Sequence, residues 1–307
     1  TQKFTSEEKF TLDQFIVNGG KTLWMIDNVQ ADQDSLMATG KMLAYPRDLD
    51  LTDLLFSYGI RINTTLIKDL YAAKIALATG KVGNQTQFQN LDWFYHPLVS
   101  GNPNNAITKN IAPVRLQFAN QIDTLKNNIK KTPLLMSSPL TQKIGTPTII
   151  ELQSIADEPL EQEYVSGNQL FAVLLEGNFK SAYKNRIKPF ETSLFKENAS
   201  NNKMIVISDG DIAKNQVLKG KPTDLSRDKW TSEEFGNKDF LLNSVDYLLD
   251  DTGLIELRNK TLKISVLDKQ KAYKERAFWQ FLNVAFPLIL LFTFGFIFNY
   301  LRKRKYS

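Results

Sequence analysis

The sequence predicts an α/β domain, with a mostly parallel sheet flanked by helices, followed by one transmembrane helix. Short apolar runs at 23–27, 134–137 and 204–209 each end in a polar residue, as buried parallel strands often do. Helical patterns alternate with these runs, which favours helices on both faces of the sheet. Near the C-terminus, residues 278–301 form an apolar stretch without a formal charge.

The domain begins with a helix. Thr5 and Glu8 have the spacing of a capping box, and Phe10 begins an apolar face. A double glycine at 19–20 ends this helix directly before the strand at 23–27. The chain starts at Thr1, immediately ahead of the helix, so we expect a further strand upstream.

The later elements follow from similar signals. Helices are expected at 51–58, closed by Gly59, and at 238–249, with Asn237 as the N-cap. Composition also indicates two added strands, which can run antiparallel, and two polar loops. These are the strands 147–152 and 169–175 and the loops 82–90 and 101–105.

The apolar stretch is long enough to span a lipid bilayer. As a helix, its 24 residues would extend about 36 Å, against a hydrocarbon core about 30 Å thick. Aromatic residues at both of its ends suit the membrane interfaces. The predicted organisation is therefore a domain at 1–253, a juxtamembrane stalk at 254–277, a transmembrane helix at 278–301 and a basic tail at 302–307.

The flanking charges leave the orientation of this helix open. Seven Lys and Arg residues lie within twenty residues before it and four directly after it. A bare count would place the domain in the cytoplasm. Long domains, however, cross membranes largely regardless of their charge, and the four downstream charges form a dense block.

Composition excludes several classes of protein. The chain has no cysteine and one histidine, so disulfides, thiolate metal sites, a cysteine nucleophile and paired-histidine zinc sites are ruled out. Its net charge of +5 includes four positive charges at 302–305, which leaves +1 for the other 303 residues. A nucleic-acid-binding domain would carry its excess charge on its body. We therefore expect no nucleic-acid partner.

Two apparent catalytic motifs do not hold. Gly20, Lys21 and Thr22 resemble the end of a P-loop, but Phe15 stands where the first glycine belongs, and the order is helix then strand rather than strand then helix. His96 has no G-x-S-x-G serine elbow to accompany it, so we interpret it as a loop or core histidine. Nothing in the sequence calls for a cofactor.

Acidic side chains mark a candidate ligand crevice. Asp27 closes one predicted strand, and Asp209 and Asp211 close another. In open α/β sheets ligands bind beyond the carboxyl ends of the strands. The helix N-terminus near Asn237 could add backbone donors. Such a crevice would favour a cation, a polyol or a basic peptide, whereas the alternative is that these aspartates cap loops and helices.

The order of several stretches resembles the GldG family of gliding-motility-associated, substrate-binding-like auxiliary proteins of ABC transporters. The resemblance covers nearly the whole chain and includes the terminal span and basic tail. The matching stretches are SEEK through GGKTL (6–23), LLFSYGIRI (54–62), PLLMSSP (133–139), LEGNFKS (175–181), IVISDGD (205–211) and GNKDFLLNSVDYLL (236–249).

This resemblance implies a fold related to class I glutamine-amidotransferase domains without the nucleophilic cysteine, in agreement with a chain that has none. It implies a non-catalytic subunit whose extracytoplasmic (periplasmic) domain lies between two spans of the inner membrane, with a cytoplasmic C-terminus. A permease and an ATPase would be its partners. The expected N-terminal span is not among these 307 residues.

A second hypothesis assigns the protein to a different functional class, that of enzymes. A membrane-anchored hydrolase or sugar-active enzyme could work with Asp27, Asp209 and Asp211 alone, because paired carboxylates suffice for glycoside hydrolysis. The spacing of the three does not require it. The sequence names neither a transported substrate nor a ligand of the domain.

Overall fold

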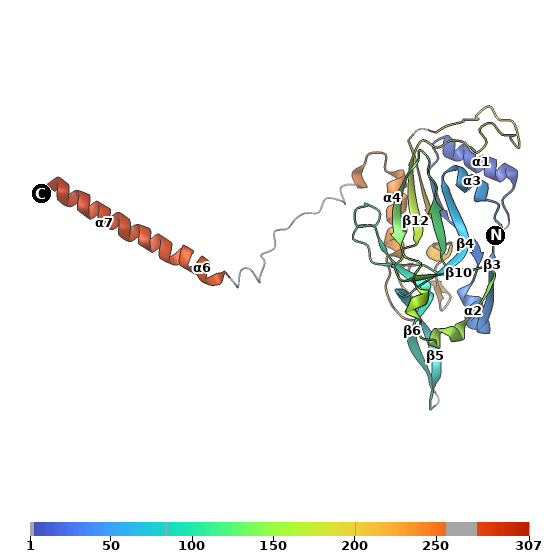
Figure 1. Ribbon diagram of the computed structural model, residues 1–307, viewed down its shortest axis with the longest axis horizontal. Coiled ribbons are helices and arrows are strands. Elements are labelled where there is room, and N and C mark those ends of the chain that lie inside the picture. The colour runs from blue at the N-terminus through green and yellow to red at the C-terminus, as the bar shows by residue number, and fades with distance from the viewer. Residues whose placement is uncertain (1–2, 84, 200, 256–274, 307) are drawn as a thin grey trace. The chain divides into compact units, whose positions relative to one another are not determined.

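The computed structural model describes residues 3–83, 85–199, 201–255 and 275–306. The chain divides into two units, residues 1–260 and 261–307, which are described separately. The first is a mixed α/β domain with a curled sheet, and the second contains the apolar helix (Figure 1).

The main sheet has seven strands. Its order is β1 (Thr22–Met25), β13 (Asn202–Ile207), β12 (Leu170–Gly177), β9 (Lys130–Met136), β6 (Gln85–Gly101) and β5 (Ala72–Val82), and β7 (Val114–Arg115) pairs with β6. The predicted strands at 23–27, 134–137, 169–175 and 204–209 are therefore confirmed, although the strand ends differ from the predicted ones by one to four residues.

The prediction of a mostly parallel sheet is wrong. Only β1 and β13 run parallel among the described ladders, whereas β12 is antiparallel to both of its neighbours, β13 and β9. The apolar runs indicated strands that are buried on both faces. An interior antiparallel strand can be buried in the same way. The apolar runs therefore do not indicate whether neighbouring strands are parallel or antiparallel.

Helices cover both faces of the main sheet (Figure 1). Val173 and Val206 face a core that includes residues of α1 (Ser6–Val17) and α3 (Thr52–Ser57). The alternate residues Leu174 and Ile205 pack on the other face, with Phe240 of α4 (Asn237–Leu249). This alternation places two apolar layers around the same strands.

Two smaller sheets complete the strand architecture around the core. β4 (Ile60–Asp69) lies between β10 (Thr141–Gly145) and β8 (Asn120–Thr124), and β3 (Lys41–Pro46) lies between β11 (Thr148–Glu151) and β2 (Val29–Gln30), all antiparallel. β11 confirms the predicted strand at 147–152. The short elements are α2 (Gln33–Thr39), the 3₁₀ turns η1 (Leu152–Ala156), η2 (Glu161–Glu163) and η3 (Asp211–Ala213), and the hairpin of β14 (Val217–Leu218) and β15 (Lys221–Pro222).

Capping signals were used to predict the start of α1, the end of α3 and the start of α4, and the first two predictions are correct. In α1 the Thr5 hydroxyl accepts from the Glu8 amide at 3.2 Å, and the Glu8 carboxylate accepts from the Thr5 amide at 2.8 Å. After α3, Gly59 adopts a φ of 88°, which favours glycine. The predicted N-cap of α4 is wrong, because Gly236 occupies that position and Asn237 is the first helical residue.

The predicted loop at 82–90 is also wrong. β5 and β6 form a long antiparallel hairpin whose ladder runs from Ala72 to the turn at Gly83 and back (Figure 1). Residues 85–90 are exposed on both faces, so they show no alternation of polar and apolar residues that would indicate a strand. Of the loop predicted at 101–105, Gly101 is the last residue of β6 and residues 102–105 follow the strand.

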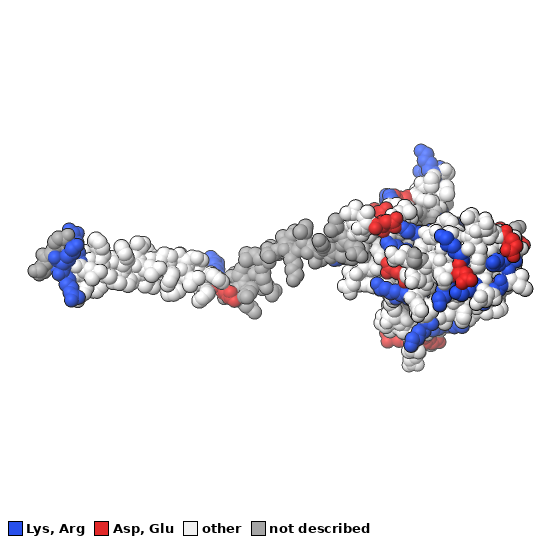
Figure 2. Space-filling model, turned by 90° about the horizontal axis from the view of Figure 1, so that it is seen from above, with Lys and Arg blue, Asp and Glu red and all other residues white. Residues whose placement is uncertain are grey.

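The described part of the second unit, residues 275–306, is helical almost throughout. It comprises α6 (Arg276–Gln280), a π-helical turn η5 (Phe281–Ala285) and α7 (Phe286–Tyr306). The π turn ends two residues before Pro287, whose missing N–H disturbs the helical ladder. Among the described residues one helix, Arg276–Lys305, is long and apolar enough to cross a membrane. Its surface is free of charge over most of its length, with Lys and Arg gathered at the end (Figure 2).

Candidate functional site

The edge at which β1 and β13 end carries three aspartates, as predicted. Because the two strands are parallel, their carboxyl ends lie together, and the residues that follow them meet. Asp27 accepts a hydrogen bond from the Gly210 amide at 2.6 Å. A Cβ on Gly210 would lie 2.5 Å from Asp27 Oδ2, so a larger residue here would force the Asp27 carboxylate to move.

Asp209 is the centre of this edge and is fully buried. Its two carboxylate oxygens accept from the backbone amides of Gln117 at 2.7 Å and Asp211 at 2.8 Å. The first bond holds the segment that follows β7 against the end of β13. The carboxylate therefore closes the edge with backbone hydrogen bonds.

Burial and mutual repulsion change the acidity of these groups. Burial raises the pKa of Asp209 well above its usual value, and the charge of Asp27 adds to that shift. The pKa of Asp27 is raised by burial and by the charge of Asp211, against the opposing hydrogen bond from Gly210. Burial also raises the pKa of Asp211. The close placement of the three acids therefore costs stability when all are ionised.

Lys214 moderates the negative charge at the edge. Its ammonium lies 3.6 Å from Asp211 Oδ1 and 3.4 Å from Asp32 Oδ1. Burial lowers the pKa of Lys214, but the surrounding aspartates outweigh it, and the net shift is upward. Asp32 is also the N-cap of α2, where it accepts from the Ser35 amide at 2.8 Å. The lysine thus connects η3 to the start of α2.

The structure brings Asp27, Asp209 and Asp211 together but does not place Asn237 with them in the same hydrogen-bond cluster. The Asn237 side chain pairs with both backbone groups of Arg115, at 2.9 Å and 2.8 Å. It therefore fixes β7 against the start of α4. Among the residues that the structure describes, no group of three or more acidic or histidine side chains is arranged to hold a metal ion.

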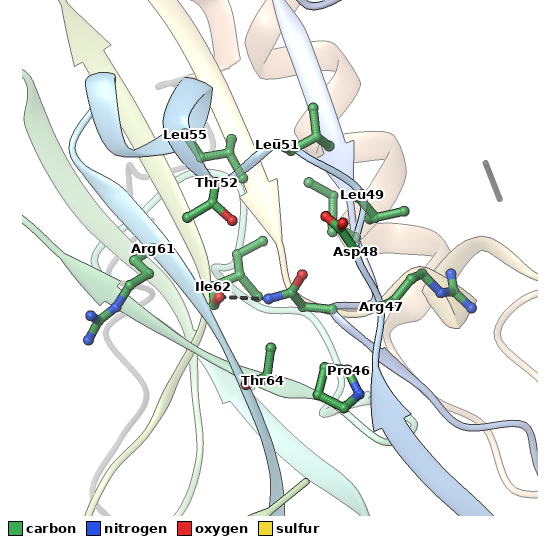
Figure 3. A pocket seen from close by; sticks show the side chains of 12 residues that line it. Pro46, Arg47, Asp48, Leu49, Leu51, Thr52, Leu55, Arg61, Ile62 and Thr64 are labelled. Atoms are coloured by element: carbon green, nitrogen blue, oxygen red, sulfur yellow. Dashed lines mark hydrogen bonds between the residues drawn. The ribbon is translucent and has the colours of Figure 1, made fainter. Parts of the chain in front are cut away.

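A pocket of about 260 Å³ lies next to this edge (Figure 3). Ile26 and Asn28, which flank Asp27 in sequence, form part of its wall, and the rest comes from the end of β3, the segment between β3 and α3, α3 itself and β4. The side-chain amide of Asn28 donates to the backbone carbonyl of Ile62 at 2.8 Å, as the dashed line in Figure 3 shows. The three aspartates do not line it.

The walls of this pocket combine apolar side chains with polar and charged ones. Leu49, Leu51 and Leu55 contribute apolar surface, and Arg47 and Arg61 bring cationic side chains. Arg61 is paired with Asp123 at 2.6 Å. Sequence reasoning missed both arginines, and no sequence signal could have placed them together, because they belong to elements with unrelated patterns.

The chemistry of the edge is that of a structural connection. Asp27 Oδ1 and both oxygens of Asp209 already accept backbone N–H groups. His96 lies in β6, buried in the core, as the sequence interpretation allowed. The fold and the edge together define a class: a mixed α/β domain with a hydrogen-bonded acidic edge, joined to a helix of membrane-spanning length.

The chain belongs to the ABC transport auxiliary family described as "ABC-type uncharacterized transport system", whose model matches residues 1–244. Membership indicates an auxiliary component of an ABC-type transport system. The match ends at residue 244, within α4, so it covers nearly all of the described domain.

Two further similarities are more distant. A protein of Borreliella burgdorferi named "Uncharacterized protein" is 22% identical over 306 residues, which are 96% of this chain and 53% of that relative. The chain thus spans about half the length of the curated relative that it matches. The solved "mmIFT52 N-terminal domain" is similar at 12% identity, with a TM-score of 0.38 over 81% of this chain and 74% of that one. A likeness at that level carries no argument.

Proposed function

We propose that the protein is a non-catalytic, membrane-anchored auxiliary subunit of an ABC transporter that supports gliding motility or an associated export process. The observation that carries the proposal is the family match over residues 1–244, followed by a helix of membrane-spanning length at Arg276–Lys305. The resemblance to the GldG family supplies the finer assignment. It also supplies the expected kinship with amidotransferase domains.

The acidic edge supports a non-catalytic role. A carboxylate-dependent hydrolase would need oxygens of Asp27 and Asp209 to reach a substrate. Three of these oxygens are occupied by backbone amides instead. We therefore infer that the edge holds the domain together and that partner binding is the function of the whole.

Co-purification tests this proposal. The affinity-tagged chain, extracted from native membranes in mild detergent, is expected to bring down a permease and an ATPase in fixed ratio. The matched control carries an unrelated apolar helix of equal length in place of residues 276–305, which preserves anchoring. Recovery of the wild-type chain without either subunit would refute the proposal. Recovery by the control as well would place the contact in the domain.

We further propose that the domain is periplasmic and the basic block at 302–305 cytoplasmic. A dense block of Lys and Arg directly after a span is typical of the cytoplasmic side. The absence of native cysteine makes the test clean, because a single introduced thiol is the sole target. Thr86→Cys, at the exposed hairpin, is expected to react with an impermeant maleimide in spheroplasts, whereas Ser307→Cys reacts only after lysis. The reverse pattern would overturn the orientation.

A further inference from the structure

A second pocket, on another part of the domain, contains unpaired buried polar groups. Seven buried side-chain polar atoms lack a hydrogen-bond partner among the described residues. Four of them belong to three residues that line one pocket of about 260 Å³: Gln33 Oε1, His96 Nδ1, His96 Nε2 and Arg115 Nε. Buried polar groups in native proteins are almost always paired. Their concentration here indicates a site that is completed by something other than this chain.

His96 contributes a neutral hydrogen-bonding group to this pocket. The residue is 2% exposed. Its ring packs against the ring of Phe118 in an edge-to-face arrangement. Burial lowers the pKa of His96 well below its ordinary value, and the positive charge of Arg115 lowers it further. The neutral ring has one donor and one acceptor, and neither has a partner among the residues that the structure describes.

Arg115 contributes a buried charge with donor capacity to spare. Its guanidinium bonds Asp228 at 2.6 Å, and both side chains are 9% exposed. Asp228 is already well supplied, since it also accepts from the amides of Trp230 and Thr231 and from the side chain of Gln216. These donors hold the pKa of Asp228 well below its usual range. The carboxylate is therefore satisfied, whereas Arg115 Nε has no acceptor in the described part of the chain.

The rest of the pocket combines apolar and polar side chains and has one more basic than acidic residue. Met37, Ile75, Val217 and the 63% exposed Trp230 provide apolar walls. Of the charged side chains in its lining, three are Lys or Arg and two are Asp. The ammonium of one lysine, Lys229, lies 5.4 Å from the centre of the Trp230 ring. An apolar body and a negative charge are the complementary features of a ligand.

We infer that this pocket binds a small organic carboxylate with an apolar body. The carboxylate would accept from Arg115 Nε and from the N–H of His96, which pairs buried donors that are otherwise unpaired. Gln33 could join them, since its amide presents NH₂ in place of oxygen when it is turned over. The apolar body would pack between Ile75 and Trp230. The volume is below the range of about 300–1,000 Å³ for drug-sized ligands, so the ligand is small.

The sole histidine of the chain provides a direct test. Benzoate is the probe, and benzamide is its neutral analogue of equal shape. We expect benzoate to shift the imidazole NMR signals of the whole chain in detergent in a saturable way, and benzamide to leave them unchanged at the same concentration. Arg115→Gln is expected to abolish the shift, although loss of the buried charge can also unfold the domain.

A pair of surface variants keeps the test independent of folding. Val217 and Leu218 are adjacent and exposed in β14, but only Val217 lines the pocket. Val217→Glu is expected to weaken benzoate binding about tenfold by repulsion, whereas Leu218→Glu changes it less than twofold. Equal effects of both variants, equal response to benzamide, or no shift of His96 by benzoate would overturn the inference. The last result would assign the space to water.

Discussion

The acidic edge and the His96 pocket are both polar and buried, yet they differ in how their polar groups are paired. At the edge, Asp209 is fully buried and each of its oxygens accepts a backbone amide. In the pocket, nitrogen atoms of His96 and Arg115 have no hydrogen-bond partner within the described ranges. Residue type alone would have favoured the aspartates as the functional site. The hydrogen bonds indicate instead that the edge is structural and that the pocket is the better candidate for a ligand.

The largest expected effect comes from the one charge pair of the pocket. Asp228→Asn removes the counter-charge of the buried Arg115 and should lower the free energy of unfolding by about 3 kcal/mol. Asp224→Asn is the matched control, because it breaks an exposed pair with Lys238 and should change stability far less. Urea unfolding measures both. A small effect of Asp228→Asn would show that water or another group pairs with the Arg115 guanidinium. The pocket would then not differ from the acidic edge in how its polar groups are paired.

An intermediate effect is expected where the edge is tightest. Gly210→Ala forces a Cβ against the Asp27 carboxylate and should cost about 1–3 kcal/mol. Gly145→Ala is the control, because its Cβ would meet no atom within 4 Å and its φ is not positive. Its change should stay within about 0.5 kcal/mol. Thermal unfolding of the two variants side by side decides, and similar melting temperatures would contradict a closed edge.

The smallest effect concerns the acidity of the edge. The pKa of Asp27 is raised in the folded state, so between the unfolded pKa and this raised pKa the folded state binds more protons. Stability therefore falls as pH rises through that window. Asp27→Asn keeps the acceptor for Gly210 and removes the charge. It should be more stable than the wild type at pH 8, by about 1 kcal/mol, and no more stable at pH 4.

Urea titrations at the two pH values check this expectation. A difference that is the same at pH 4 and pH 8 would mean that the charge of Asp27 is not the cause. A loss of stability at pH 8 would mean that the carboxylate contributes more to the edge than its repulsion costs.

Sequence reasoning succeeded where the signal is local. The capping box of Thr5 and Glu8 and the turn at Gly59 depend on neighbouring residues, and both were predicted correctly. The meeting of Asp27 and Asp209 was also predictable, because each follows an apolar strand and the two strands happen to be parallel. Strand direction elsewhere was not, since burial on both faces produces the same apolar run in either direction.

The groups of the His96 pocket were beyond such reasoning. Arg115 and Asp228 are 113 residues apart, and neither belongs to a recognisable motif. His96 was interpreted as a loop or core histidine, and the structure places it in the core, but one sequence could not show that its ring nitrogens have no partner among the described residues. Likewise, the amide of Asn237 looked like a helix cap, whereas the tertiary structure directs it to the backbone of Arg115.

The hairpin of β5 and β6 has a consequence for how the chain can change over time. In its outer half, from Ala78 around the turn to Asn90, the two strands pair only with each other, and the described side chains are exposed. A two-stranded ribbon of this kind adds little to the stability of a domain. Substitutions and insertions there would therefore be nearly neutral for folding. This arm is the part of the domain that can acquire a new recognition surface while the core stays as it is.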